Sequence, residues 1–82
     1  MSYTPELVAE LEILALFNLG STQEGLKVHQ TAAPTAIAAA RRLYEKDLID
    51  QPDGGYLTSL GRDAAEHAQS LLTILATDKE AA

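Results

Sequence analysis

The sequence contains no cysteine and no long apolar run, and each absence excludes a class of protein. Without cysteine the chain has neither a disulfide framework nor a thiolate zinc site. Met1 is followed by neither a basic region nor an extended apolar stretch, so we expect no signal peptide and no membrane span. The expected location is therefore the cytoplasm.

Basic residues are scarce as well. Six Lys and Arg stand against twelve Asp and Glu, which gives a net charge of -6 and argues against a general attraction to phosphate backbones. Their distribution is uneven, because residues 25–46 hold four bases and one acid, a local balance of +3. The four bases are Lys27, Arg41, Arg42 and Lys46.

The sequence offers no constellation for catalysis. His29 and His67, the two histidines, lie far apart and do not have a metal-ligand spacing such as His-x-x-x-His. No Gly-x-Ser-x-Gly nucleophile turn is present, and neither Gly20-Ser21 nor Asp53-Gly54-Gly55 continues into a phosphate-binding loop. We expect no enzymatic activity, no metal and no cofactor.

The residues that are present predict one mainly α-helical domain over residues 1–77, followed by a polar tail over residues 78–82. A chain of 82 residues buries a single core. Apolar residues make up 46% of it and are mostly alanine and leucine, with few aromatics, which is typical of helices.

The pattern predicts four helices, over residues 5–20, 22–28, 34–46 and 60–77. Thr4-Pro5 fits the cap and first position of the first helix, and Gly20 its end. Ser21-Thr22-Gln23-Glu24 fits a capping box at the start of the second. Residues 26–28 also fit a strand, because so few residues cannot separate the two periods, and we favour the helix.

A two-stranded β-hairpin is predicted between the third and fourth helices. In Pro52-Asp53-Gly54-Gly55 the proline presets a negative φ, the aspartate can bond its own backbone and the glycines supply positive φ. Tyr56-Leu57 then returns as a short strand, and Thr58 or Ser59 caps the fourth helix. We take this hairpin as the element around which the chain is organised.

The third helix is expected to have an apolar inner face and a partly basic outer face. The inner face is predicted to hold Ala36, Ile37, Ala40, Leu43 and Tyr44. The outer face is predicted to hold Thr35, Ala38, Ala39, Arg42 and Lys46, with Arg41 at its edge.

The order of these elements resembles a winged helix-turn-helix domain. The likeness is carried by residues 43–49 (LYEKDLI) and 53–62 (DGGYLTSLGR), which resemble the end of the third helix and the wing in many bacterial regulators. The whole chain also resembles a small bacterial family of conserved proteins of unknown function, through TPEL at 4–7, FNL at 17–19, TQEG at 22–25 and DGGYLTSLG at 53–61.

The winged-helix resemblance implies a transcriptional regulator that binds duplex DNA, with the third helix in the major groove. It implies base or phosphate contacts by Lys27, Thr35, Arg41, Arg42 and Lys46. The sequence departs from this pattern at the wing, where Asp50 and Asp53 stand in place of bases and would repel phosphate. The alternative is therefore an acidic winged-helix module or adaptor that binds a protein partner and no nucleic acid.

The first helix is apolar on two sides, which is typical of a helix buried against more than one neighbour. The fourth helix could cover the second side within a single chain, but we favour the interpretation of this side, together with the last helix, as a homodimer interface. The residues predicted to form it are Ile13, Leu16, Phe17 and Ile74.

Overall fold

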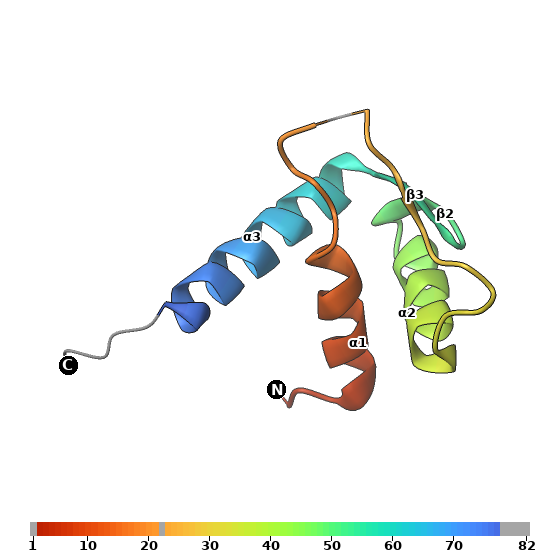
Figure 1. Ribbon diagram of the computed structural model, residues 1–82, viewed down its shortest axis with the longest axis horizontal. Coiled ribbons are helices and arrows are strands. Elements are labelled where there is room, and N and C mark those ends of the chain that lie inside the picture. The colour runs from red at the N-terminus through yellow and green to blue at the C-terminus, as the bar shows by residue number, and fades with distance from the viewer. Residues whose placement is uncertain (1, 22, 78–82) are drawn as a thin grey trace.

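The computed structural model describes residues 2–21 and 23–77, and within them the chain forms three helices and a three-stranded antiparallel sheet (Figure 1). Residue 22 and the predicted tail over residues 78–82 lie outside the described residues. The elements are α1 Pro5–Leu14, β1 Leu26–Lys27, α2 Pro34–Glu45, β2 Ile49–Gln51, β3 Gly54–Leu57 and α3 Ser59–Ala76. A mainly helical domain is confirmed, whereas the predicted number of four helices is wrong for the part of the chain that is described.

α1 begins where the sequence predicts and ends earlier. The Thr4 hydroxyl oxygen accepts the N–H of Leu7 at 3.1 Å and Pro5 occupies the first turn. The helix ends at Leu14 instead of reaching Gly20. Beyond it Phe17 turns into the core, and the freed carbonyls accept hydrogen bonds from α3, so tertiary contacts replace the helical ones.

The predicted second helix is not formed in residues 23–28, and strand β1 stands in its place. The Ser21 hydroxyl accepts the N–H of Gln23 at 3.1 Å, and the Glu24 carboxylate accepts a hydrogen bond from the Asn18 side chain at 2.8 Å. Neither side chain therefore plays its part in a capping box. Leu26 and Lys27 pair with β3, a partner far away in the sequence.

The β2–β3 hairpin forms as predicted and gains β1 as a third strand, in the order β1-β3-β2. Gly54 and Gly55 have φ of 131° and 76°, a region that glycine enters without steric cost. A Cβ on Gly54 would lie 2.1 Å from the Leu26 carbonyl oxygen. Gly54, the first residue of β3, therefore permits the close approach of β1.

α3 follows the hairpin almost directly. The Thr58 hydroxyl accepts the N–H of Gly61 at 3.0 Å and donates to the Asp47 carbonyl at 2.7 Å, which caps the helix and ties it to the residues before β2. A Cβ on Gly61 would lie 1.8 Å from the Leu48 carbonyl oxygen. The start of α3 thus packs against backbone at a distance that only glycine allows.

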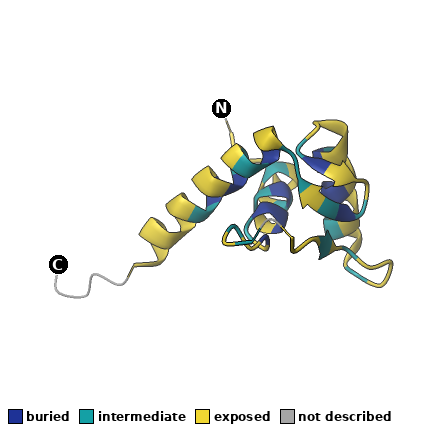
Figure 2. Ribbon diagram, turned by 90° about the horizontal axis from the view of Figure 1, so that it is seen from above, coloured by how far each residue is buried: buried dark blue, intermediate teal, exposed yellow. Residues whose placement is uncertain are grey.

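The core lies between α1, α2, β2 and the first half of α3 (Figure 2). Its largest fully buried side chains are Leu43 and Ile49. Ala39 is also fully buried, so its predicted place on the outer face of α2 is wrong, whereas Ile37 and Tyr44 are partly exposed. Alanines surround α2 on most sides, and this weakens the periodicity from which the buried face was predicted.

Candidate functional site

Two of the bases predicted to contact DNA instead hold α2 against α1. The Glu10 carboxylate on α1 is only 7% exposed; its Oε2 accepts from Arg42 Nε at 2.7 Å and its Oε1 from Lys46 Nζ at 2.5 Å. Arg42 Nη2 also donates to the Glu6 carbonyl at 3.1 Å. The charges of Arg42 and Lys46 are therefore largely satisfied within the chain.

The ionisation of Glu10 follows from this geometry. Burial would raise the pKa of the carboxyl, but the hydrogen bonds and the positive charges of Lys46 and Arg42 outweigh it, and the pKa of Glu10 is lowered. Glu10 is therefore a carboxylate at neutral pH. Its role is to hold the two helices together with a buried charge that has two partners.

Lys27 is engaged in a similar way at the sheet. Its Nζ lies 2.6 Å from Oδ2 of Asp53, and the two side chains are 62% and 47% exposed. The hydrogen bond from Lys27 lowers the pKa of Asp53. This exposed pair joins β1 to the hairpin turn. Asp53 is the acid expected to repel phosphate and Lys27 a base expected to attract it, so the two charges neutralise each other.

The remaining predicted DNA contacts, Thr35 and Arg41, are both exposed on α2 and lie at different hollows. Thr35 shares a hollow of about 300 Å³ with Arg42 and the first turn of α1. Arg41 shares another, of about 420 Å³, with Lys27 and the hairpin turn. Four of the five residues therefore divide between two hollows, and the fifth, Lys46, lines neither and is bound to Glu10.

The residues predicted to form a dimer interface do not share one surface either. Ile13 and Phe17 are 4% and 6% exposed and belong to the core, so their predicted place at an interface is wrong. Leu16 is exposed beside Leu26 and Val28. Ile74 is exposed near the end of α3.

The second half of α3 carries a group of exposed apolar side chains. Residues 70–77 are all exposed, and this part of the helix extends beyond α1 and α2 as an arm (Figures 1 and 2). It includes Leu71 at 48%, Leu72 at 45%, Ile74 at 69% and Leu75 at 70% exposure. We call these four residues the α3 patch.

Two side chains of α3 fasten the segment that follows α1. The Gln69 side-chain N–H₂ donates to the carbonyls of Phe17 at 2.7 Å and Leu14 at 3.1 Å, and Arg62 donates to the carbonyl of Leu19. These bonds satisfy carbonyl groups that the short α1 leaves free. The α3 patch begins just beyond Gln69, the last of these attachments.

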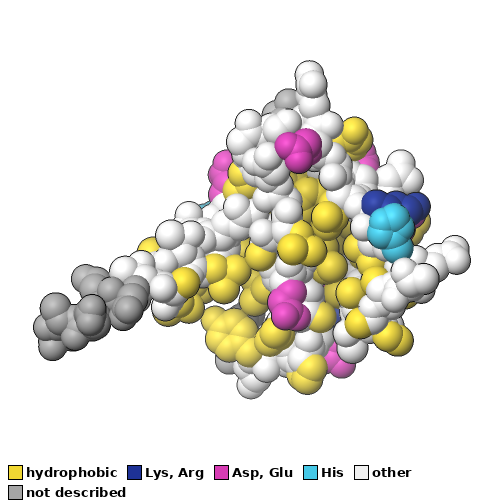
Figure 3. Space-filling model, viewed as in Figure 1, with side chains coloured by type: hydrophobic (Ala, Val, Ile, Leu, Met, Phe, Trp, Pro, Cys, Tyr) yellow, Lys and Arg dark blue, Asp and Glu magenta, His cyan; other side chains and the backbone are white. Residues whose placement is uncertain are grey.

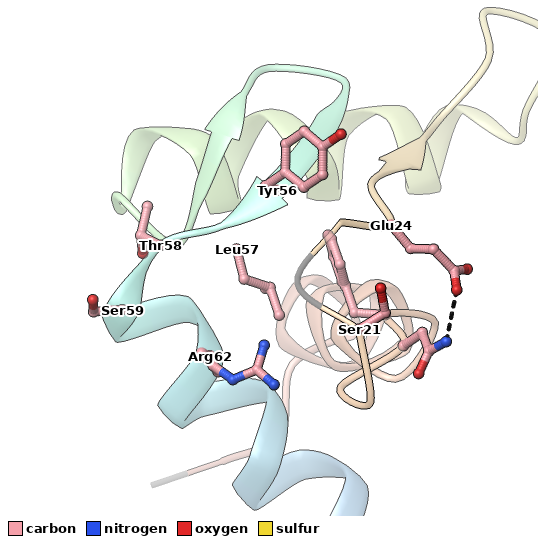
Figure 4. A pocket seen from close by; sticks show the side chains of 9 residues that line it. Ser21, Glu24, Tyr56, Leu57, Thr58, Ser59 and Arg62 are labelled. Atoms are coloured by element: carbon pink, nitrogen blue, oxygen red, sulfur yellow. Dashed lines mark hydrogen bonds between the residues drawn. The ribbon is translucent and has the colours of Figure 1, made fainter.

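A small hollow lies where α3 and β3 meet Phe17, Asn18, Ser21 and Glu24 (Figure 4). Its volume is about 160 Å³, which is below the range of about 300–1,000 Å³ typical of small-molecule sites. Three of its polar side chains are engaged: Arg62 bonds to Leu19, Thr58 caps α3, and Glu24 accepts a hydrogen bond from Asn18. We interpret this hollow as a structural joint.

A family model described as "Family of unknown function (DUF5669)" matches residues 1–76. The chain belongs to this family. The match agrees with the expected likeness to a conserved family of unknown function. No curated protein and no solved structure matches the chain.

Within residues 2–21 and 23–77, no group of His, Cys, Asp or Glu side chains is placed to hold a metal ion. The same residues include no helix with the length and hydropathy needed to cross a membrane.

Sequence reasoning missed the roles of Glu10 and Gln69 in this family member. The available signal is that Glu10 is an acid on an otherwise apolar helix surface, and a buried acid of this kind needs a basic partner. The bases of residues 41–46 were the available partners. Gln69 carries no comparable signal, since a glutamine on a helix is ordinarily a solvent-exposed residue.

Proposed function

We propose that the chain is a protein-interaction module that forms a homodimer through the α3 patch, independently of DNA. The observation that carries this proposal is the exposure of Leu71, Leu72, Ile74 and Leu75 on a helix that leaves the core. Exposed apolar patches rimmed by polar residues mark interaction sites. A helix end this apolar gains most by packing against another helix.

The chemistry of the arm favours a second copy of the same chain. No Asp, Glu, Lys or Arg occurs between Glu66 and Asp78 in the sequence, and the exposed outer half of α3 in Figure 3 carries apolar and uncharged side chains. Two copies with a net charge of -6 would repel each other at most faces. At this uncharged patch they can pair symmetrically, as an isologous interface requires.

The free energy of association expected for such a dimer is small. Burying the exposed half of four Leu or Ile side chains on each protomer contributes roughly 1 kcal/mol per side chain, or about 8 kcal/mol in total. Association costs about 4–15 kcal/mol in lost freedom. At the lower cost about 4 kcal/mol remains, so the balance predicts a weak, reversible dimer with a dissociation constant of about a millimolar or higher.

Molar mass measured by light scattering over a range of concentrations tests the proposal. The molar mass of the unmodified chain should rise from that of a monomer towards that of a dimer as the concentration increases. The Ile74→Gln/Leu75→Gln variant should keep the monomer mass and an unchanged circular dichroism spectrum. The matched control is Leu16→Gln, which replaces an exposed leucine elsewhere and should still dimerise. A monomer mass for the unmodified chain at every concentration contradicts the proposal.

DNA binding is the second candidate, and one observation favours it. The sheet order β1-β3-β2, with α2 leading into the β2–β3 hairpin, supports a winged-helix arrangement. We propose that a single turn stands for the missing helix before α2, where the Ala32 N–H donates to the His29 carbonyl at 2.9 Å.

The pairing of the basic side chains argues against DNA binding by this fold. Arg42 and Lys46 share Glu10, and Lys27 is paired with Asp53, so little positive charge remains to displace counterions. Titration with duplex DNA at low salt separates the two candidates, because phosphate contacts strengthen there. The homodimer proposal predicts no binding, whereas binding that weakens steeply as salt is added would favour the regulator.

A further inference from the structure

The hollow that Arg41 shares with Lys27 lies between three parts of the chain: β1 and the residues after it, α2, and the hairpin turn. Its volume is about 420 Å³, within the range of about 300–1,000 Å³ found for small-molecule sites. It is lined by no residue of α3, so it is separate from the α3 patch. Val28, Ile37, Ala40 and Pro52 give it apolar walls.

Arg41 is the charged group that the chain leaves available at this hollow. All Lys and Arg residues except Lys79 lie in the described part of the chain. Lys27, Arg42 and Lys46 have carboxylate partners within 2.7 Å, and Arg62 donates to the Leu19 carbonyl. Among the described residues Arg41 has neither a carboxylate nor a carbonyl partner, so its guanidinium donors remain for solvent or a ligand.

The local charge balance favours one anionic group. Lys27 and Asp53 also line the hollow, and their charges cancel at 2.6 Å. Arg41 therefore leaves a net charge of +1 beside apolar walls. A planar guanidinium binds a carboxylate through two parallel hydrogen bonds, and a single positive charge matches a monoanion better than a phosphate dianion.

We propose that this hollow binds a small organic carboxylate with an apolar body, with Arg41 on the carboxylate and Val28, Ile37 and Pro52 against the apolar part. The site is independent of self-association, because none of its walls comes from α3. The monomeric Ile74→Gln/Leu75→Gln variant should therefore bind such a ligand as the unmodified chain does.

Titration of the ¹⁵N-labelled chain with benzoate, followed by amide NMR shifts, tests the site. Shifts should saturate and centre on Val28, Gln30 and Arg41, with an affinity near the millimolar range expected for so small a ligand. Benzamide, an uncharged compound of the same shape, should bind roughly tenfold or more weakly, because it lacks the charge-assisted bonds.

Three variants identify the residue responsible. Arg41→Gln should weaken benzoate binding roughly tenfold, Arg41→Lys should keep part of it, and the control Thr35→Ala, exposed on the same helix outside this hollow, should keep all of it. Equal binding of benzoate and benzamide, unchanged binding by Arg41→Gln, or no saturable shift at these residues each overturns the proposal.

Discussion

Lys46 Nζ, at the end of α2, lies 2.5 Å from the buried carboxylate of Glu10 on α1, and Arg42 holds the other oxygen of that carboxylate at 2.7 Å. One acid thus engages two bases of the most positive segment of the chain. This arrangement stabilises the α1–α2 contact and removes positive charge from the surface that a winged-helix regulator would present to DNA.

Replacing Glu10 by glutamine should lower the free energy of unfolding by about 1–3 kcal/mol, because hydrogen bonds between charged groups become weaker ones and Arg42 loses its countercharge. Urea denaturation followed by circular dichroism measures the change. Glu12→Gln, on an exposed position of the same helix, is the control and should stay within about 0.5 kcal/mol of the unmodified chain. Equal stability of both variants would show that the cluster contributes nothing.

The contribution of Glu10 should also depend on pH in a defined direction. The pKa of Glu10 is lowered in the folded chain, and an unfolded glutamate has a pKa of about 4.3. Such a group contributes stability above its unfolded pKa and loses it as the pH falls through its folded pKa. The stability difference between the unmodified chain and Glu10→Gln should therefore be full at pH 7 and shrink below about pH 4.3. A difference that grows on acidification contradicts this assignment.

Gly61→Ala should destabilise the chain by about 1–3 kcal/mol or more, since the added Cβ would lie 1.8 Å from the Leu48 carbonyl oxygen and the backbone must shift to admit it. The control is Ser59→Ala, at the exposed first position of α3, which should change stability little. Thermal unfolding of the two variants compares them. A melting temperature for Gly61→Ala equal to that of the control would contradict the close packing of α3 on the hairpin.

Gln69→Leu should loosen the attachment of α3 to the end of α1, because the carbonyls of Phe17 and Leu14 lose their donor. Leaving such groups without a partner costs about 1–3 kcal/mol. Hydrogen exchange should accelerate in residues 15–19 and in the second half of α3. Gln23→Leu, at an exposed position remote from these bonds, is the control; the same exchange pattern in both variants would argue against the role of Gln69.

The sequence predicts the elements whose signals are local. Residues 52–55 predict the hairpin, Pro34 predicts the start of α2, and the Thr58 cap predicts the start of α3. The predictions that failed concern elements that depend on distant partners. β1 forms because Leu26 pairs with Gly55. α1 stops at Leu14, and Gln69 donates hydrogen bonds to the carbonyls of Leu14 and Phe17.

The candidate sites show the same division. The sequence shows the bases of residues 41–46 as a cluster. Glu10, the partner of Arg42 and Lys46, lies on another helix, so nothing near these bases in the sequence indicates that their charge is engaged. The apolar side of α3 is buried only as far as Ala68, and beyond it Leu71, Leu72 and Leu75 are exposed. This follows from the early end of α1, for which the sequence has no local signal.

The most direct test of the homodimer uses the absence of cysteine from the chain. Single cysteines at Leu71, Ile74 or Leu75 place the only thiol of each variant on the α3 patch, and a disulfide requires Cα atoms within about 7 Å. If the chain pairs through the α3 patch, mild oxidation should yield covalent dimer at one or more of these positions and little with the exposed control Leu16→Cys. Equal cross-linking at Leu16, or none at any α3 position, would contradict this pairing.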